Sequence, residues 1–115
     1  MKKLAVFFLV SVLCSMLLLA HGETKTGLLA DGHCGPGMVG DEAKASDHKV
    51  TCVLSCKDNG FGIIADGKFY PFDEEGNKQA LALLEATEKG SDLKVRVEGD
   101  FEEDLIKVSA IETVE

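Results

Sequence analysis

The chain has 115 residues, of which 45% are apolar, enough for one small domain. Its 20 acidic and 12 basic residues give a net charge of −8 at pH 7. This balance excludes a nucleic-acid-binding protein that works through a basic patch, because phosphate affinity comes mainly from Lys and Arg. The length excludes a multidomain enzyme.

The segment Met1–Gly22 predicts a signal peptide. Two lysines follow the initial Met, the stretch from Leu4 to Ala20 carries no charge, and Ala20-His21-Gly22 suits cleavage before Glu23. The alternative is an uncleaved N-terminal anchor, since the uncharged stretch is near the lower limit of length for a membrane span. We expect an extracytoplasmic protein, periplasmic or secreted, whose residues 23–115 form one domain of net charge −10. Such a domain binds neither nucleic acid nor, after cleavage, a membrane.

The first half of this domain predicts a strand, a loop and a helix. The strand is expected over Thr26–Ala30, and the glycine-rich run Asp31–Gly37 predicts a loop. Ser46 or Asp47 is a suitable N-cap for a helix that extends to about Asp58.

The second half predicts a hairpin, a helix and two further strands. The pair Asp66-Gly67 favours the positive φ angles of a type I′ turn, which joins two strands tightly. Asn77 is a suitable N-cap for the helix, in which Leu81 and Leu84 belong to an apolar stripe. The expected elements are strands Phe61–Ala65 and Lys68–Phe72, a helix Lys78–Glu88, and strands Leu93–Glu98 and Leu105–Ile111.

The order of these elements predicts an α+β fold. Five strands, with one helix after the first strand and one between the third and fourth, are typical of a small OB-like antiparallel barrel. The helix capped by Asn77 would close one end of this barrel. The alternative is an open antiparallel sheet with one helix packed on it.

The cysteines and histidines indicate a candidate metal site. In His48-x-x-x-Cys52-x-x-x-Cys56 the three side chains drift by only about 40° per step along a continuous helix, so they would share one stripe. Cys34 lies in the glycine-rich loop, which could fold back over this stripe. Three thiolates and one imidazole suit zinc or Cu(I), so Cys34, His48, Cys52 and Cys56 are the candidate ligands. His33 is an alternative to His48.

A disulfide from Cys34 to Cys52 or to Cys56 is the competing interpretation, because exported proteins meet oxidising conditions. Closing a loop of about twenty residues would stabilise the domain by roughly 3 kcal/mol. The domain would then be a non-catalytic binding module for an envelope protein or a small ligand, with one spare thiol.

Catalysis is not expected from this chain, since no set of catalytic residues can be identified. A thiol oxidoreductase is the least favoured function. Its two cysteines would be separated by two residues at a helix N-terminus. Here three residues separate Cys52 from Cys56, and both lie inside the expected helix.

Taken together, these motifs resemble a family of small, uncharacterised exported bacterial proteins. The resemblance rests on Cys34-Gly35, on His48-x-x-x-Cys52-x-x-x-Cys56 and on Asp66-Gly67-Lys68-Phe69-Tyr70. The runs Gly27–Asp31, Gly76–Leu84 and Asp92–Gly99 complete it. It implies an extracytoplasmic domain with an OB-like element order, and it implies no particular activity.

Overall fold

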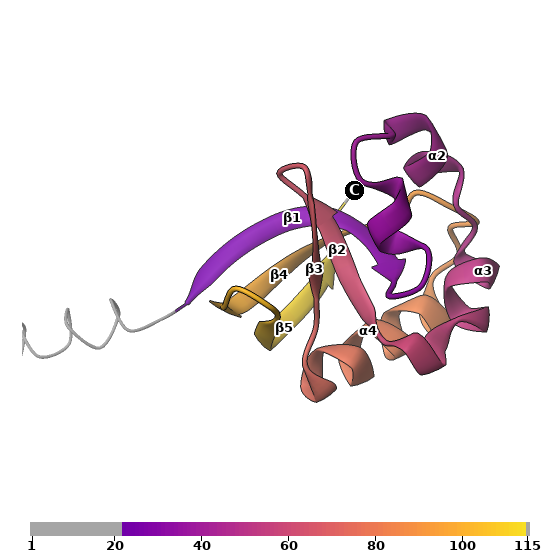
Figure 1. Cartoon of the computed structure of the whole chain (residues 1–115). Helices are drawn as coiled ribbons and strands as arrows, with labels where there is room; N and C mark the ends of the chain where they lie inside the picture. Colours follow the sequence, from indigo (N-terminus) through magenta and orange to yellow (C-terminus); the bar gives the residue numbers. More distant parts are fainter. Residues whose placement is uncertain (1–21, 115) are drawn as a thin grey trace, which may run out of the picture.

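A computed structural model of the chain describes residues 22–114 (Figure 1). The expected signal peptide therefore lies almost wholly outside the described residues. The described part is an α+β domain whose five strands form one antiparallel sheet in the order β3-β2-β1-β4-β5. In chain order its elements are β1 (Glu23–Asp31), η1 (Gly35–Met38), α2 (Glu42–Asp47), α3 (Val50–Ser55), η2 (Lys57–Asn59), β2 (Phe61–Ala65), β3 (Lys68–Pro71), α4 (Glu74–Ala86), β4 (Lys94–Phe101) and β5 (Ile106–Thr113).

The hairpin of β2 and β3 confirms the turn prediction. Asp66 and Gly67 have φ angles of 52° and 73°, the left-handed values that a type I′ turn requires at both central positions. The strands pair in register from Ala65 opposite Lys68 to Gly62 opposite Pro71.

The main core lies on the inner face of the sheet, which we define as the face that carries Leu29, Ile63 and Val95. These side chains pack with residues from α3 and α4, as the alternation along each strand predicts. The buried residues of this cluster are Leu29, Val50, Val53, Phe61, Ile63, Ala65, Phe72, Ala80, Leu84, Leu93, Val95, Val97, Ile106 and Val108.

The outer face of the sheet carries a second, smaller cluster. Ala30 of β1 packs there with Met38 of η1 and Ala45 of α2, and all three are buried. Leu28 and Ile64, which stand directly opposite each other on β1 and β2, are partly buried beside them. Residues 34–48 therefore form a covering segment over one part of the outer face, as the ribbon in Figure 1 shows.

The prediction of one continuous helix from Ser46 or Asp47 to Asp58 is wrong. Asp47 ends α2 instead of capping a helix, and His48 adopts an extended conformation with ψ of 120°. The chain then starts α3 at Val50, and Cys56 is its C-cap. The backbone of Val50 is tied to a distant loop, because its N–H donates to the carbonyl of Gly90 at 2.9 Å. This bond gives the first N–H of α3 a partner outside the helix.

The start of the later helix was also predicted wrongly. Asp73, not Asn77, caps α4, since its carboxylate accepts a hydrogen bond from the N–H of Gly76 at 3.0 Å. The same carboxylate accepts from the N–H of Val108 in β5 at 3.2 Å. Asn77 lies within the helix and accepts from the N–H of Phe61 at 2.8 Å. Ala80 and Leu84 are buried as expected.

The sheet is not closed into a barrel, so the prediction of a closed barrel is wrong. The outermost strands β3 and β5 do not form a ladder with each other. One isolated parallel bridge, from Phe72 to Ile106, links the residue after β3 to the first residue of β5. The sheet is nonetheless strongly curved. Its curvature brings Tyr70 of β3 edge to face with Phe101 of β4, with ring centroids 5.8 Å apart.

Candidate functional site

Asp31 is a fully buried carboxylate at the last position of β1, with 0% of its surface exposed. The chain turns immediately after it, and the turn supplies hydrogen bonds to the side chain. Asp31 Oδ2 accepts from the backbone N–H of Cys34 at 2.8 Å and from that of His33 at 3.1 Å. Asp commonly caps such a turn, because its short side chain reaches the N–H groups two and three residues ahead.

The surroundings of Asp31 favour its charged form. Burial acts to raise the pKa of this carboxyl, but hydrogen bonds from the Cys34 N–H, the His48 ring and the His33 N–H outweigh it. The net result is a pKa below the ordinary value of 3.8. Asp31 is therefore a buried anion at neutral pH, held by fixed donors.

His48 approaches the other carboxylate oxygen from the linker between α2 and α3. Its Nε2 lies 3.0 Å from Asp31 Oδ1, and 15% of the His48 side chain is exposed. The break between the two helices makes this contact, since the extended backbone at His48 directs the ring at the end of β1. Nε2 carries the proton when the ring donates to the carboxylate.

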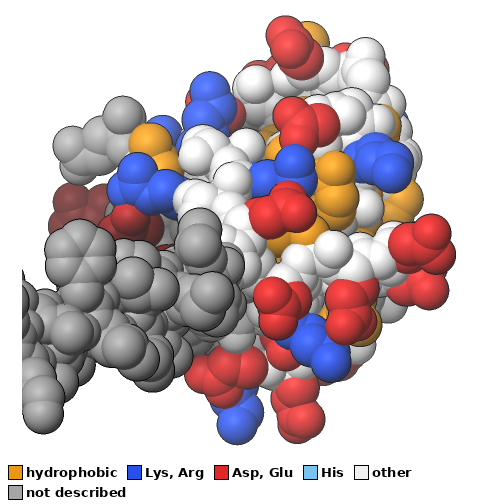
Figure 2. All heavy atoms as spheres, turned by 90° about the vertical axis from the view of Figure 1, so that its left-hand side faces the viewer, with side chains coloured by type: hydrophobic (Ala, Val, Ile, Leu, Met, Phe, Trp, Pro, Cys, Tyr) orange, Lys and Arg blue, Asp and Glu red, His pale blue; other side chains and the backbone are white. Residues whose placement is uncertain are grey.

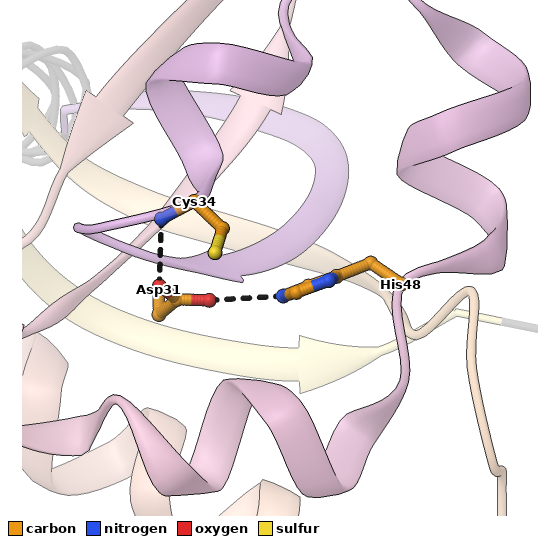
Figure 3. A group of neighbouring side chains, drawn as sticks. All are labelled: Asp31, Cys34 and His48. Carbon is orange, nitrogen blue, oxygen red and sulfur yellow. Dashed lines mark hydrogen bonds and ion pairs between the residues drawn. The ribbon is translucent and has the colours of Figure 1, made fainter.

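Cys34 completes a group of three donor atoms. The sulfur of Cys34, one carboxylate oxygen of Asp31 and one ring nitrogen of His48 all lie within 4.8 Å of one another. The Cys34 side chain and the His48 ring both point toward the Asp31 carboxylate (Figure 3). Thiolate, imidazole and carboxylate are the three side-chain ligands that zinc takes in proteins.

The expected ligand stripe on one helix does not exist, because the helix is interrupted at His48. Cys34 and His48 come together as the sequence predicts, but the third donor near them is Asp31. Cys52 is exposed on α3, and Cys56 is half-buried at its end. Among the described residues, neither of these two thiols belongs to the group of donors within 4.8 Å.

Cys56 nevertheless lies in the electrostatic field of the site. Partial burial raises the pKa of its thiol, and the negative charge of Asp31 and the neighbouring Cys34 raise it further. A thiol oxidoreductase needs the opposite shift, because its reactive species is the thiolate. All three thiols in the described part of the chain are free.

His33, the alternative to His48, contributes its backbone N–H and not its ring to the Asp31 site. The residue is exposed, and its N–H donates to Asp31. Asp31 is the donor beside Cys34 and His48 that the sequence prediction did not include. Its signal was present in Asp31-Gly32-His33-Cys34, since an Asp that ends an apolar strand and starts a turn accepts from the next backbone N–H groups.

Comparisons of this chain with models of known protein families, with curated proteins and with solved structures find no match. The family resemblance drawn from the sequence motifs therefore stays a prediction. Within residues 22–114, no helix has the length and apolar character needed to cross a membrane.

Proposed function

We propose that this domain binds a zinc-like divalent metal through Asp31, Cys34 and His48. The observation that carries the proposal is the convergence of three different donor atoms within 4.8 Å at the end of β1. Each donor comes from a different local structure: the strand end, the turn after it and the linker between α2 and α3. Such convergence from separate segments holds the donor geometry more firmly than one flexible loop can.

The oxygen and nitrogen donors of the site already lie near the spacing that a metal requires. In a tetrahedral zinc site with bonds of about 2.0 Å to oxygen and nitrogen, these two ligands are about 3.3 Å apart. Asp31 Oδ1 and His48 Nε2 are 3.0 Å apart. Binding would displace the proton from Nε2, while the Cys34 and His33 N–H groups keep holding Oδ2 and orient the carboxylate. These hydrogen bonds act as the outer shell that metal-binding carboxylates usually have.

The donor set favours zinc over copper. Cu(I) prefers thiolate and thioether ligands, whereas zinc accepts a carboxylate beside a thiolate and an imidazole. Three protein ligands leave a fourth position for water, for Cys56 or for a ligand from another molecule. We infer a metal-binding role with no catalytic step, in an exported protein as the segment Met1–Gly22 predicts.

The metal is tested by titrating the reduced protein with Zn²⁺ in a calorimeter and with Co²⁺, whose charge-transfer absorption reports thiolate coordination. Cys34→Ser and His48→Ala should each weaken metal binding by at least about ten- to one-hundredfold, because even the loss of an outer-shell partner costs that much. Cys52→Ser is the matched control and should bind like the wild type. If Cys52→Ser loses as much affinity as Cys34→Ser, the ligand set expected from the sequence is the correct one. Absence of binding at millimolar Zn²⁺ refutes the proposal.

A disulfide-stapled binding module is the second candidate, and the structure favours one pairing for it. Cys34 and Cys56 are both partly buried and Cys34 acts on the charge of Cys56, whereas Cys52 is exposed on α3. If this candidate is right, mass spectrometry of the exported, unreduced protein should show a Cys34–Cys56 bond and one free thiol at Cys52. If the exported protein carries no disulfide, this second candidate is wrong.

We also propose that the fold is a variant of the OB type. The strand order, the helix between β3 and β4 and the Phe72–Ile106 parallel bridge support this relationship. The hydrogen bond from the N–H of Asp73 to the carbonyl of Ile106, at 2.9 Å, extends the contact between the two outer strands. Slow amide exchange at Asp73 in solution would be the expected sign of this link.

A further inference from the structure

A groove lies on the outer face of the sheet, away from the Asp31 site. Its volume is about 820 Å³, within the range of ligand-binding clefts. It is bounded by the β1 backbone, by the β2–β3 turn and by the part of the covering segment that contains α2. The groove exists because α2 packs chiefly on η1, so that the helix overhangs the sheet without filling the space below it.

The floor of the groove is apolar. Leu28 and Ile64 stand opposite each other on the two central strands, and both remain partly exposed. Met38 and Ala45 continue this surface from the covering segment. Gly27 lines the groove with its backbone, beside Leu28. An apolar surface of this kind gains free energy when a partner removes it from water.

The rim of the groove is acidic. Asp41 and Glu42 stand on the side of α2, and Asp66 and Asp92 stand on the side of the sheet. Asp66 is paired with Lys25 at 2.8 Å, but Asp41, Glu42 and Asp92 take part in no ion pair among the described residues.

Few basic groups balance this rim. Lys94 is the one basic residue that lines the groove in the described structure. The face drawn in Figure 2 carries acidic and basic side chains, with apolar side chains exposed between them. A cationic partner is attracted by the acidic rim, and an anionic one is repelled.

We propose that this groove binds a peptide segment that carries both apolar and basic side chains. The apolar side chains would cover Leu28 and Ile64, and the basic ones would reach the acids on the two opposite sides of the rim. A second copy of this chain fits poorly, because its own net charge is −8. An anionic lipid surface is repelled for the same reason. The proposal does not depend on the metal site.

The first test measures binding of a fluorescent peptide of alternating Lys and Leu to the full domain by anisotropy. A Glu and Leu peptide and a Lys and Ser peptide of equal length are the controls, and each should bind at least about tenfold more weakly, since each lacks one of the two complementary features. Amide chemical shifts should change at Leu28, Ile64 and Glu42. Equal binding of the three peptides, or shifts confined to another face, overturns the proposal.

The second test uses charge variants. The double variant Glu42→Gln with Asp92→Asn should weaken binding of the Lys and Leu peptide about fivefold and reduce its salt dependence. Asn tolerates the left-handed backbone of Asp92, whose φ is 55°. The matched control Asp58→Asn with Glu88→Gln removes the same charge from exposed positions outside the groove. Equal losses in both variants would show a general charge effect and refute the groove.

The third test fills the groove. Ser46 is exposed on α2 and lines the groove, so Ser46→Trp should abolish detectable peptide binding while circular dichroism and melting stay unchanged. Full binding by this variant overturns the proposal. Sedimentation of the free domain completes the test, because a dimer that dissociates on Ser46→Trp would make a second copy the occupant and the peptide proposal wrong.

Discussion

The two faces of the sheet are built on different principles. Fourteen buried apolar residues form the cluster on the inner face, where α4 and α3 pack against the strands. Only three buried residues form the cluster on the outer face, where η1 and α2 cover part of β1 and β2. The inner face has the extended apolar contact that stabilises a small domain, and the outer face has too little of it to hold the covering segment by burial alone.

Polar contacts add to apolar burial in holding the covering segment. Asp31 binds the covering segment at both ends, through the N–H of Cys34 at its start and the ring of His48 at its finish. A buried charge with well-placed donors fixes one arrangement of the chain, although it adds little net stability. The difference between the faces teaches that the inner face stabilises the fold, while the outer face leaves a groove open beneath a segment that Asp31 holds at both ends.

The largest expected effect is the loss of stability when one buried side chain of each cluster is truncated to Ala. Ile106→Ala removes a side chain with no exposed surface from the inner cluster, and it should lower the free energy of unfolding by about 4 kcal/mol. Met38→Ala removes a 2% exposed side chain from the outer cluster, and its cost should be about 2 kcal/mol, because the partly open surroundings relax. Urea denaturation of the reduced variants measures both. An equal or larger loss for Met38→Ala would contradict the difference between the faces.

The next effect comes from breaking the polar contacts of Asp31. Asp31→Asn keeps the shape of the side chain but removes its charge, and it leaves His48 facing an amide group. We expect a loss of about 2 kcal/mol in unfolding free energy, the size of a disrupted buried network. Asp47→Asn removes a charge from an exposed position at the end of α2, and it should change the stability by less than about 0.5 kcal/mol. Urea titrations of both variants at pH 7 make the comparison.

Acidification should remove the stabilisation that the charged Asp31 carboxylate gives the wild type. The folded-state pKa of Asp31 lies below its ordinary value of 3.8, so its stabilisation is fully present above that value and is lost as the pH falls through the folded-state pKa. The stability difference between wild type and Asp31→Asn should therefore shrink below about pH 4. Urea midpoints of the two proteins over that range measure it. A difference that grows with acid would show that Asp31 is not held as an anion.

Most of the inner face could be predicted from the sequence, because period-two alternation and turn chemistry are local signals. Val95 and Val97 are buried as their alternation predicts, and Asp66-Gly67 makes the expected turn. Closure of the barrel could not be predicted, since it depends on how far the strands curl. The cap of α4 was misplaced because Asp73 and Asn77 are both good N-caps, and the choice follows from the contact of Asp73 with β5.

The outer face was harder to predict because long-range contacts decide its structure. The helix expected from Ser46 or Asp47 to Asp58 would pass through His48, but the backbone is extended there, and the N–H of Val50 donates to the distant carbonyl of Gly90. Cys34 and His48 were identified by their chemistry, and they do come together. Cys52 was included only because a continuous helix would have aligned it with His48. Asp31 was overlooked because a lone carboxylate after a strand is common.

The smallest expected effect concerns the β4–β5 part of the outer face, which carries exposed charged side chains in place of a covering segment. Arg96 and Glu112 form an ion pair there, with 49% and 64% of their side chains exposed. Glu112→Gln should change the unfolding free energy by less than about 0.5 kcal/mol, because solvent screens exposed pairs. The change should vanish in high salt, which urea titrations with and without added sodium chloride would show. A loss above about 1 kcal/mol would mean that strand pairing depends on this ion pair, and the low contribution of the outer face would then hold only over β1 and β2.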